Sequence, residues 1–102
     1  MFEFEGKQYE LKFNMQRIEM IESVTKMPTL ASINKNSGML SISDLKAYFG
    51  YAVKELGSDL FMPVKKAFEL AEKLISSEGY LKVTALVMEA LERDCPFFFQ
   101  DV

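Results

Sequence analysis

Apolar and charged residues alternate through the first stretch of the chain, and this pattern predicts a β-hairpin over residues 2–13. Gly6 and Lys7 fit the two-residue loop of a type II′ turn. Glu3 then falls opposite Glu10, a like-charge pair that disfavours this register slightly. The same register brings the apolar residues to one face of the hairpin, with Phe2 opposite Leu11 and Phe4 opposite Tyr9. That face needs a surface to rest on, because an isolated hairpin is barely stable in water.

Apolar residues spaced three and four apart predict four α-helices after the hairpin, at residues 15–25, 42–56, 63–77 and 81–94. Asn14 is a favourable N-cap for the first helix, and Ser41 with Asp44 forms a capping box at the second. Gly57 is expected to end the second helix, since glycine readily takes the left-handed conformation found at helix ends. A short turn of helix is expected near residues 30–35, and an apolar tail at residues 96–102.

The sequence therefore predicts one domain over residues 1–102, with a mostly helical α+β fold. In this fold the N-terminal hairpin packs on about four helices. Gly50 lies inside the second predicted helix, where it is about 1 kcal/mol less favourable than alanine. Two explanations fit equally well: another element approaches closely there, or the helix tolerates a weak position.

Composition narrows the classes of function. The chain has 102 residues, of which 49% are hydrophobic, and a net charge of −3. The acidic balance argues against nucleic acid as a partner, because no basic stripe is present to contact phosphates. No apolar stretch is long enough to cross a bilayer, and the acidic, alternating start is unlike a signal peptide. A soluble protein made in the cytoplasm, with no membrane partner, is expected.

No reactive group stands out in the sequence. The chain has no histidine, which removes the commonest general base and the commonest metal ligand. Its single cysteine, Cys95, is interpreted as a small, partly buried apolar residue near a helix end. We therefore expect a protein that is not an enzyme and has no catalytic, metal or cofactor site. A small enzyme that uses carboxylates or lysine alone is retained as an alternative.

Binding is the remaining class of function. The chain contains seven methionines and nine phenylalanines. Methionine is flexible and polarizable, and it is common on surfaces that accept varied apolar partners, although it also fills cores. In an extended run of three phenylalanines at least one ring must face outward or towards a partner. The predicted partner-binding residues are Phe97, Phe98, Phe99, Met27 and Met39.

The order of these segments resembles the tail assembly chaperones of long-tailed bacteriophages and prophages. The resemblance rests on "FEFEGKQYELKF", then "IEMIE", a loosely structured middle, and "AEKLISSEGYLKVTALVMEALE". It extends from Phe2 to about Leu91 and includes no catalytic motif.

The resemblance implies a chaperone that binds the long, apolar, largely helical tape-measure protein in the host cytoplasm. Such chaperones keep this client soluble until tail-tube protein polymerises around it, and they are not expected in the mature virion. Tail-tube protein is a further expected partner, recruited by the longer, frameshifted form of many family members. Self-association through the edge of the hairpin is a further hypothesis. The alternative function is a small structural virion component, such as a head–tail connector or tail-completion protein.

Overall fold

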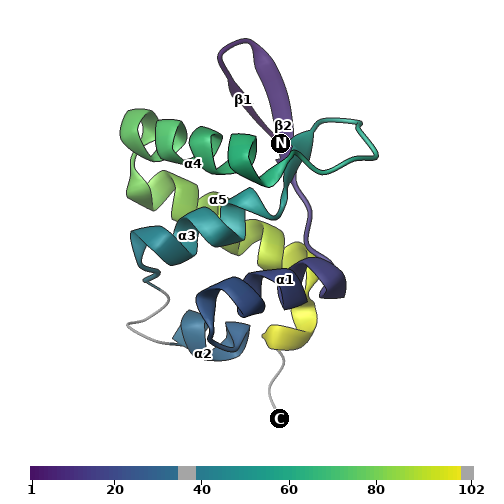
Figure 1. Cartoon of the computed structure of the whole chain (residues 1–102), viewed down its shortest axis with the longest axis vertical. Coiled ribbons are helices and arrows are strands. Elements are labelled where there is room, and N and C mark those ends of the chain that lie inside the picture. Colours follow the sequence, from purple (N-terminus) through teal and green to yellow (C-terminus); the bar gives the residue numbers. More distant parts are fainter. Residues whose placement is uncertain (35–38, 100–102) are drawn as a thin grey trace.

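A three-stranded antiparallel sheet and five α-helices make up the part of the chain that the structure describes, residues 1–34 and 39–99 (Figure 1). The structure is a computed structural model, and it confirms a mostly helical α+β fold. The elements in chain order are β1 (Phe2–Phe4), β2 (Lys7–Leu11), α1 (Met15–Thr25), α2 (Thr29–Asn34), α3 (Ile42–Gly50), β3 (Val53–Glu55), α4 (Val64–Glu78), α5 (Tyr80–Asp94) and the 3₁₀ helix η2 (Pro96–Phe98).

Three of the four predicted helices are found within one residue of their predicted bounds, as α1, α4 and α5. Asn14 caps α1 as expected, because its side-chain oxygen accepts a hydrogen bond from the Arg17 amide at 2.8 Å. The predicted turn near residues 30–35 corresponds to α2 up to Asn34, and position 35 lies outside the described residues. Positions 100–102 of the predicted tail also lie outside them.

The predicted register of the hairpin is wrong by two residues. The loop consists of Glu5 and Gly6, whose φ angles of 51° and 81° are both positive, as a type I′ turn requires. A shift of two keeps the same side chains on the same face, so the apolar face is as expected. The like-charge pair disappears, because Glu3 lies opposite Gln8, while Glu10 pairs with Lys54 of β3.

The predicted helix over residues 42–56 is also wrong in its second half. α3 begins as predicted, with Ser41 accepting a hydrogen bond from the Asp44 amide, but it ends at Gly50. The chain then forms β3, which pairs with β2 and places Val53 fully in the core. Gly57 lies in the turn after β3 rather than at a helix end. Pairing with β2 outweighs the local helical preference, because β3 provides hydrogen-bond partners for backbone groups of β2 that a helix would leave unpaired.

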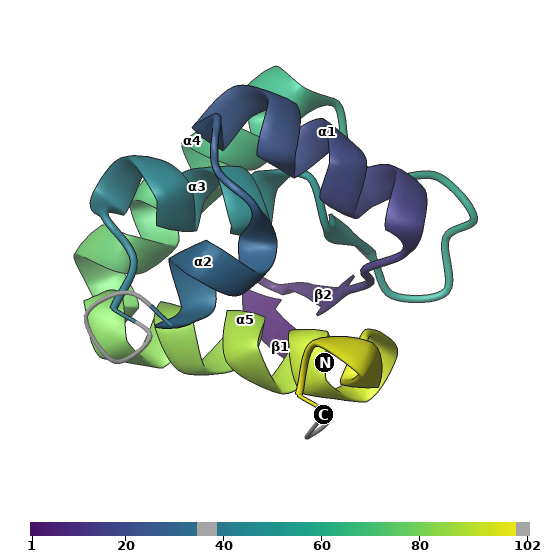
Figure 2. The same ribbon diagram turned by 90° about the horizontal axis from the view of Figure 1, so that it is seen from below.

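The apolar face of the hairpin packs against α3. Phe2 on this face also contacts Tyr9, its partner in the neighbouring strand. The Phe2 ring lies 5.6 Å from the ring of Tyr9 and 5.8 Å from the ring of Phe49 in α3. α3 is the central helix and packs against α1, α4 and α5. Figure 2 shows α1 at one side of the molecule and α5 at the other, with α2 between them.

Gly50 permits a close approach between α3 and α4. A Cβ atom built at Gly50 would overlap the ring of Phe68 in α4, and that ring also packs edge-on against Tyr51 at 5.9 Å. The first of the two explanations from the sequence is therefore confirmed: glycine is present because a side chain would collide with the neighbouring helix.

Asp94 joins the end of α5 to the segment between β2 and α1. Its carboxylate accepts hydrogen bonds from the Phe13 amide at 2.9 Å, from Arg93 at 2.8 Å and from Lys12 at 3.3 Å. The Asp94 side chain is 3% exposed. Arg93 also donates to the carbonyl of Leu11. One side chain thus fixes the point where sheet and helices meet.

α2 is held to the body through polar contacts. The two buried residues of α2 are Thr29 and Ser32, and the Tyr48 hydroxyl of α3 donates to the Thr29 hydroxyl at 3.1 Å. Glu22 accepts a hydrogen bond from the Thr29 amide at 2.6 Å. Ile33 of α2 also packs against the core, so α2 is attached both by these hydrogen bonds and by apolar contact.

Replacement of Tyr48 by phenylalanine is expected to lower the free energy of unfolding by about 1 kcal/mol, because the buried Thr29 hydroxyl loses its partner. Urea titration followed by circular dichroism measures this. Tyr51→Phe is the matched control, with a change below about 0.5 kcal/mol expected because Tyr51 is only half-buried. Equal losses in the two variants would contradict a specific role for the Tyr48 hydroxyl.

Candidate binding surfaces

The C-terminal phenylalanines divide into one anchored ring and two exposed rings. Phe98 packs against the core, whereas Phe97 is 45% and Phe99 is 38% exposed. The rings of Phe97 and Phe98 lie 4.8 Å apart, so the partly buried ring of Phe98 supports the exposed ring of Phe97. Pro96 begins η2, and its fixed φ angle favours this turn directly after α5. We call the exposed pair Phe97 and Phe99 the terminal phenylalanine surface.

Met27 and Met39 come together in one hollow of about 370 Å³ beside α2. Met27 is half-buried and Met39 is 49% exposed. We call this site the methionine hollow, and its lining residues are Thr25, Met27, Ser32, Met39, Leu40, Ser41, Asp44 and Tyr80. The lining contains none of the three phenylalanines, so the structure places the predicted partner-binding residues on two separate surfaces.

Three of the polar side chains around the methionine hollow make hydrogen bonds that belong to the fold. The Tyr80 hydroxyl donates to the Leu40 carbonyl at 2.6 Å, and the Thr25 hydroxyl donates to the Met27 carbonyl at 3.2 Å. Ser41 caps α3. The hydroxyl of Ser32 has no hydrogen-bond partner within the described residues. The surface that remains for a partner therefore combines two thioethers, which suit varied apolar side chains, with the polar side chains of Ser32 and Asp44.

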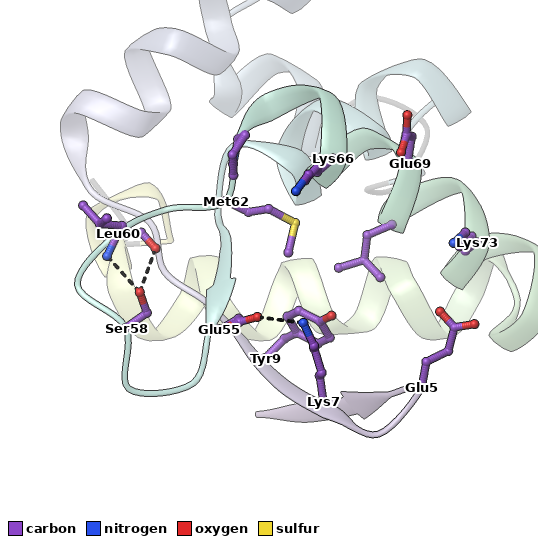
Figure 3. A pocket seen from close by; sticks show the side chains of 12 residues that line it. Glu5, Lys7, Tyr9, Glu55, Ser58, Leu60, Met62, Lys66, Glu69 and Lys73 are labelled. Carbon is purple, nitrogen blue, oxygen red and sulfur yellow. Dashed lines mark hydrogen bonds and ion pairs between the residues drawn. The ribbon is translucent and has the colours of Figure 1, made fainter.

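A groove between the sheet and α4 was not expected from the sequence (Figure 3). It has a volume of about 360 Å³, and we call it the hairpin groove. Figure 3 shows Met62 and Tyr9 between the two elements, with Glu5 and Lys73 on opposite walls at one end. Its charged residues are of both signs: Glu5, Lys7, Glu55, Lys66, Glu69 and Lys73.

The sequence did contain one signal for the hairpin groove. Lys7 shares the inward face of the sheet with Tyr9, where the alternation otherwise places apolar residues. Lys7 pairs there with Glu55 at 3.5 Å, and both side chains are more than half exposed. A charged residue within an apolar alternation marks the point where the sheet extends beyond the helices (Figure 1).

Two adjacent titratable side chains at the end of α5, Asp94 and Cys95, have shifted pKa values, and both are part of the packed structure. Burial alone would raise the pKa of Asp94, but its hydrogen bonds from Arg93, Phe13 and Lys12 outweigh this and lower the pKa to about 2. Burial raises the pKa of the Cys95 thiol, and Cys95 is buried as expected at the end of α5. The thiol therefore stays protonated at neutral pH.

Within residues 1–34 and 39–99, no group of three or more cysteine, aspartate or glutamate side chains is arranged to hold a metal ion. In the same part of the chain, no helix is both long and apolar enough to span a bilayer.

Comparisons with known proteins gave no match to a family model, to a curated protein or to a solved structure.

Proposed function

We propose that this protein is a tail assembly chaperone of a phage or prophage, which binds the tape-measure protein and keeps it soluble until tail-tube protein polymerises. The order of segments from the hairpin to α5 is the basis of this proposal, through the resemblance to that family. The structural observation that supports it best is the terminal phenylalanine surface, where two rings are exposed next to an anchored third.

The chemistry of such a chaperone is reversible burial of apolar surface. A fully buried phenylalanine contributes about 1.5–3 kcal/mol, so contacts of this size are individually weak and together hold a client. Weak contacts are also displaced readily, which a protein needs if it must later release its client.

The net charge of −3 supports the same function. Copies that crowd along one client repel one another weakly through their like charge, and this repulsion favours solubility. Lysines and glutamates both line the hairpin groove, so that surface offers polar contacts to a helical client as well.

Replacement of Phe97 by aspartate tests the proposal. We expect co-expression with a tape-measure fragment to give a soluble complex, and Phe97→Asp to weaken the affinity by about tenfold, because a buried aromatic contact becomes a charge. The measurement is the soluble fraction of the fragment, followed by titration of the purified complex.

Leu81→Asp is the matched control, because Leu81 is 71% exposed on α5 and carries a comparable apolar side chain. Phe98→Asp also removes a ring, but it disturbs the packing on the core and therefore tests stability as well as binding. The proposal is wrong if the fragment is equally insoluble with and without this protein. Equal effects of Phe97→Asp and Leu81→Asp would show that the phenylalanines have no special role.

A further inference from the structure

The outer edge of β1 has free backbone groups at one defined residue. The order of the sheet is β1-β2-β3, so β1 is an edge strand in the described part of the chain. In a hairpin with a two-residue loop the flanking pair, Phe4 and Lys7, is hydrogen-bonded, and pairs alternate from there. Gln8 turns its carbonyl to β3, where it accepts from the Leu56 amide at 3.0 Å. Its partner Glu3 therefore turns its N–H and C=O away from the sheet.

An apolar hollow of about 290 Å³ lies beside this edge, between β1 and the helices α4 and α5. Its deepest side chains are Leu74 and Val83, which are almost fully buried, while Phe2 forms its wall on the sheet side. We call this site the edge hollow, and its lining residues are Met1, Phe2, Glu3, Leu74, Glu78, Lys82, Val83 and Leu86. A free strand edge beside an apolar hollow is the arrangement that binds extended peptides by strand addition.

The charges at this edge favour one kind of occupant. Glu3 is exposed and points to the outer face of the sheet, opposite Gln8. Lys82, the cation that lines the edge hollow, is paired with Glu78 at 2.9 Å. An antiparallel pairing of two copies centred on this residue would place Glu3 opposite Glu3, which is unfavourable. A basic residue opposite Glu3 is favourable.

We propose that β1 binds, by strand addition, an extended segment of another protein in which a lysine or arginine lies between two apolar residues. The basic residue pairs with the backbone of Glu3 and lies next to its carboxylate on the outer face. The two apolar neighbours point to the opposite face, as Phe2 and Phe4 do, and one of them enters the edge hollow. This site is separate from the terminal phenylalanine surface, and the inference does not depend on the chaperone function.

Two synthetic peptides of equal length test the site, one alternating valine with lysine and one alternating valine with glutamate. We expect the lysine peptide to bind about tenfold more tightly, since Glu3 attracts one peptide and repels the other. Glu3→Lys should reverse this preference. Equal binding of the two peptides, or no binding of either at millimolar concentration, would overturn the proposal.

Glu3→Pro separates backbone pairing from charge. Proline removes the outward N–H of Glu3, and it is tolerated at edge positions where this group faces solvent. We expect the affinity for the lysine peptide to fall about tenfold further than in Glu3→Ala, which removes the charge and keeps the N–H. Equal affinities in these two variants would show that no strand is added.

Hydrogen exchange of the wild-type protein needs no variant and covers the case that Glu3→Pro folds poorly. The Glu3 amide should become protected when the lysine peptide binds, whereas amides on the far side of the sheet should not change.

Sedimentation of the protein alone tests whether a second copy of the chain occupies the edge of β1. A dimer that Glu3→Pro dissociates would show that a second copy occupies the edge, and it would overturn the proposal.

Discussion

Replacement of Asp94 by alanine is expected to lower the free energy of unfolding by about 3 kcal/mol, because it removes a buried carboxylate that several donors share. The Phe13 amide, Arg93 and Lys12 all donate to this carboxylate. The amide is the costliest donor to leave without a partner, since it lies next to the buried Phe13 side chain. Urea titration at neutral pH measures the loss.

The pH dependence of unfolding isolates the charge of Asp94. Its pKa in the folded protein is about 2, below the ordinary value of 3.8. The ionised form therefore stabilises the fold by about 2 kcal/mol above pH 4, and this contribution disappears as the pH falls from there through 2. Asp94→Asn keeps the size of the side chain and cannot ionise. The difference in stability between wild type and Asp94→Asn should shrink by about 2 kcal/mol over that range.

Glu92→Ala is the matched control for both experiments, because Glu92 is an exposed carboxylate in the same helix. Its effect on the free energy of unfolding should stay within about 0.5 kcal/mol at any pH. If Asp94→Asn and the wild type lose stability in parallel on acidification, Asp94 does not have the role that its hydrogen bonds indicate.

The hairpin shows how far alternation alone specifies a structure. Alternation fixes which side chains share a face, and the structure confirms that Phe2, Phe4 and Tyr9 do. It does not fix the register, because any shift by two residues preserves the faces. Two loops preserve these faces, Gly6-Lys7 and Glu5-Gly6, and each requires its own turn type. The pairs that β2 forms with β3 decide between the two loops.

β3 was missed because its formation depends on residues far away in the sequence. The apolar residues of the predicted helix over 42–56 continue at helical spacing beyond Gly50, so a local pattern favours helix. Val53 and Ala52 are buried in either case. The deciding interactions are with β2, including the hydrogen bond from the Lys12 amide to the Ala52 carbonyl at 2.9 Å. No local signal contains this information.

The candidate surfaces were predictable to different degrees. An extended run of three phenylalanines must direct at least one ring outward or towards a partner. The run instead begins in the 3₁₀ helix η2, and Phe97 and Phe99 are nevertheless exposed. The meeting of Met27 with Met39 depends on how α2 folds between them, which spacing does not reveal. The edge hollow combines β1 with two helices near the other end of the chain, so its existence required the tertiary structure.

Replacement of Gly50 by alanine is expected to destabilise the protein by about 2 kcal/mol, although helix propensity alone favours alanine by about 1 kcal/mol. The added Cβ overlaps the ring of Phe68, which must move out of its contact with Tyr51. Ser76→Ala, at an exposed position of α4, should by contrast be neutral or slightly stabilising.

A double-mutant cycle with Phe68→Ala identifies the cause of the loss. Once the ring of Phe68 is absent, the Cβ at position 50 has room, and the propensity of alanine for the helix is all that remains. Gly50→Ala should therefore stabilise the protein by about 1 kcal/mol in the Phe68→Ala background, which corresponds to a coupling of about 3 kcal/mol between the two positions. Additive losses would show that Gly50 is needed for its backbone conformation and not for the space it leaves between α3 and α4.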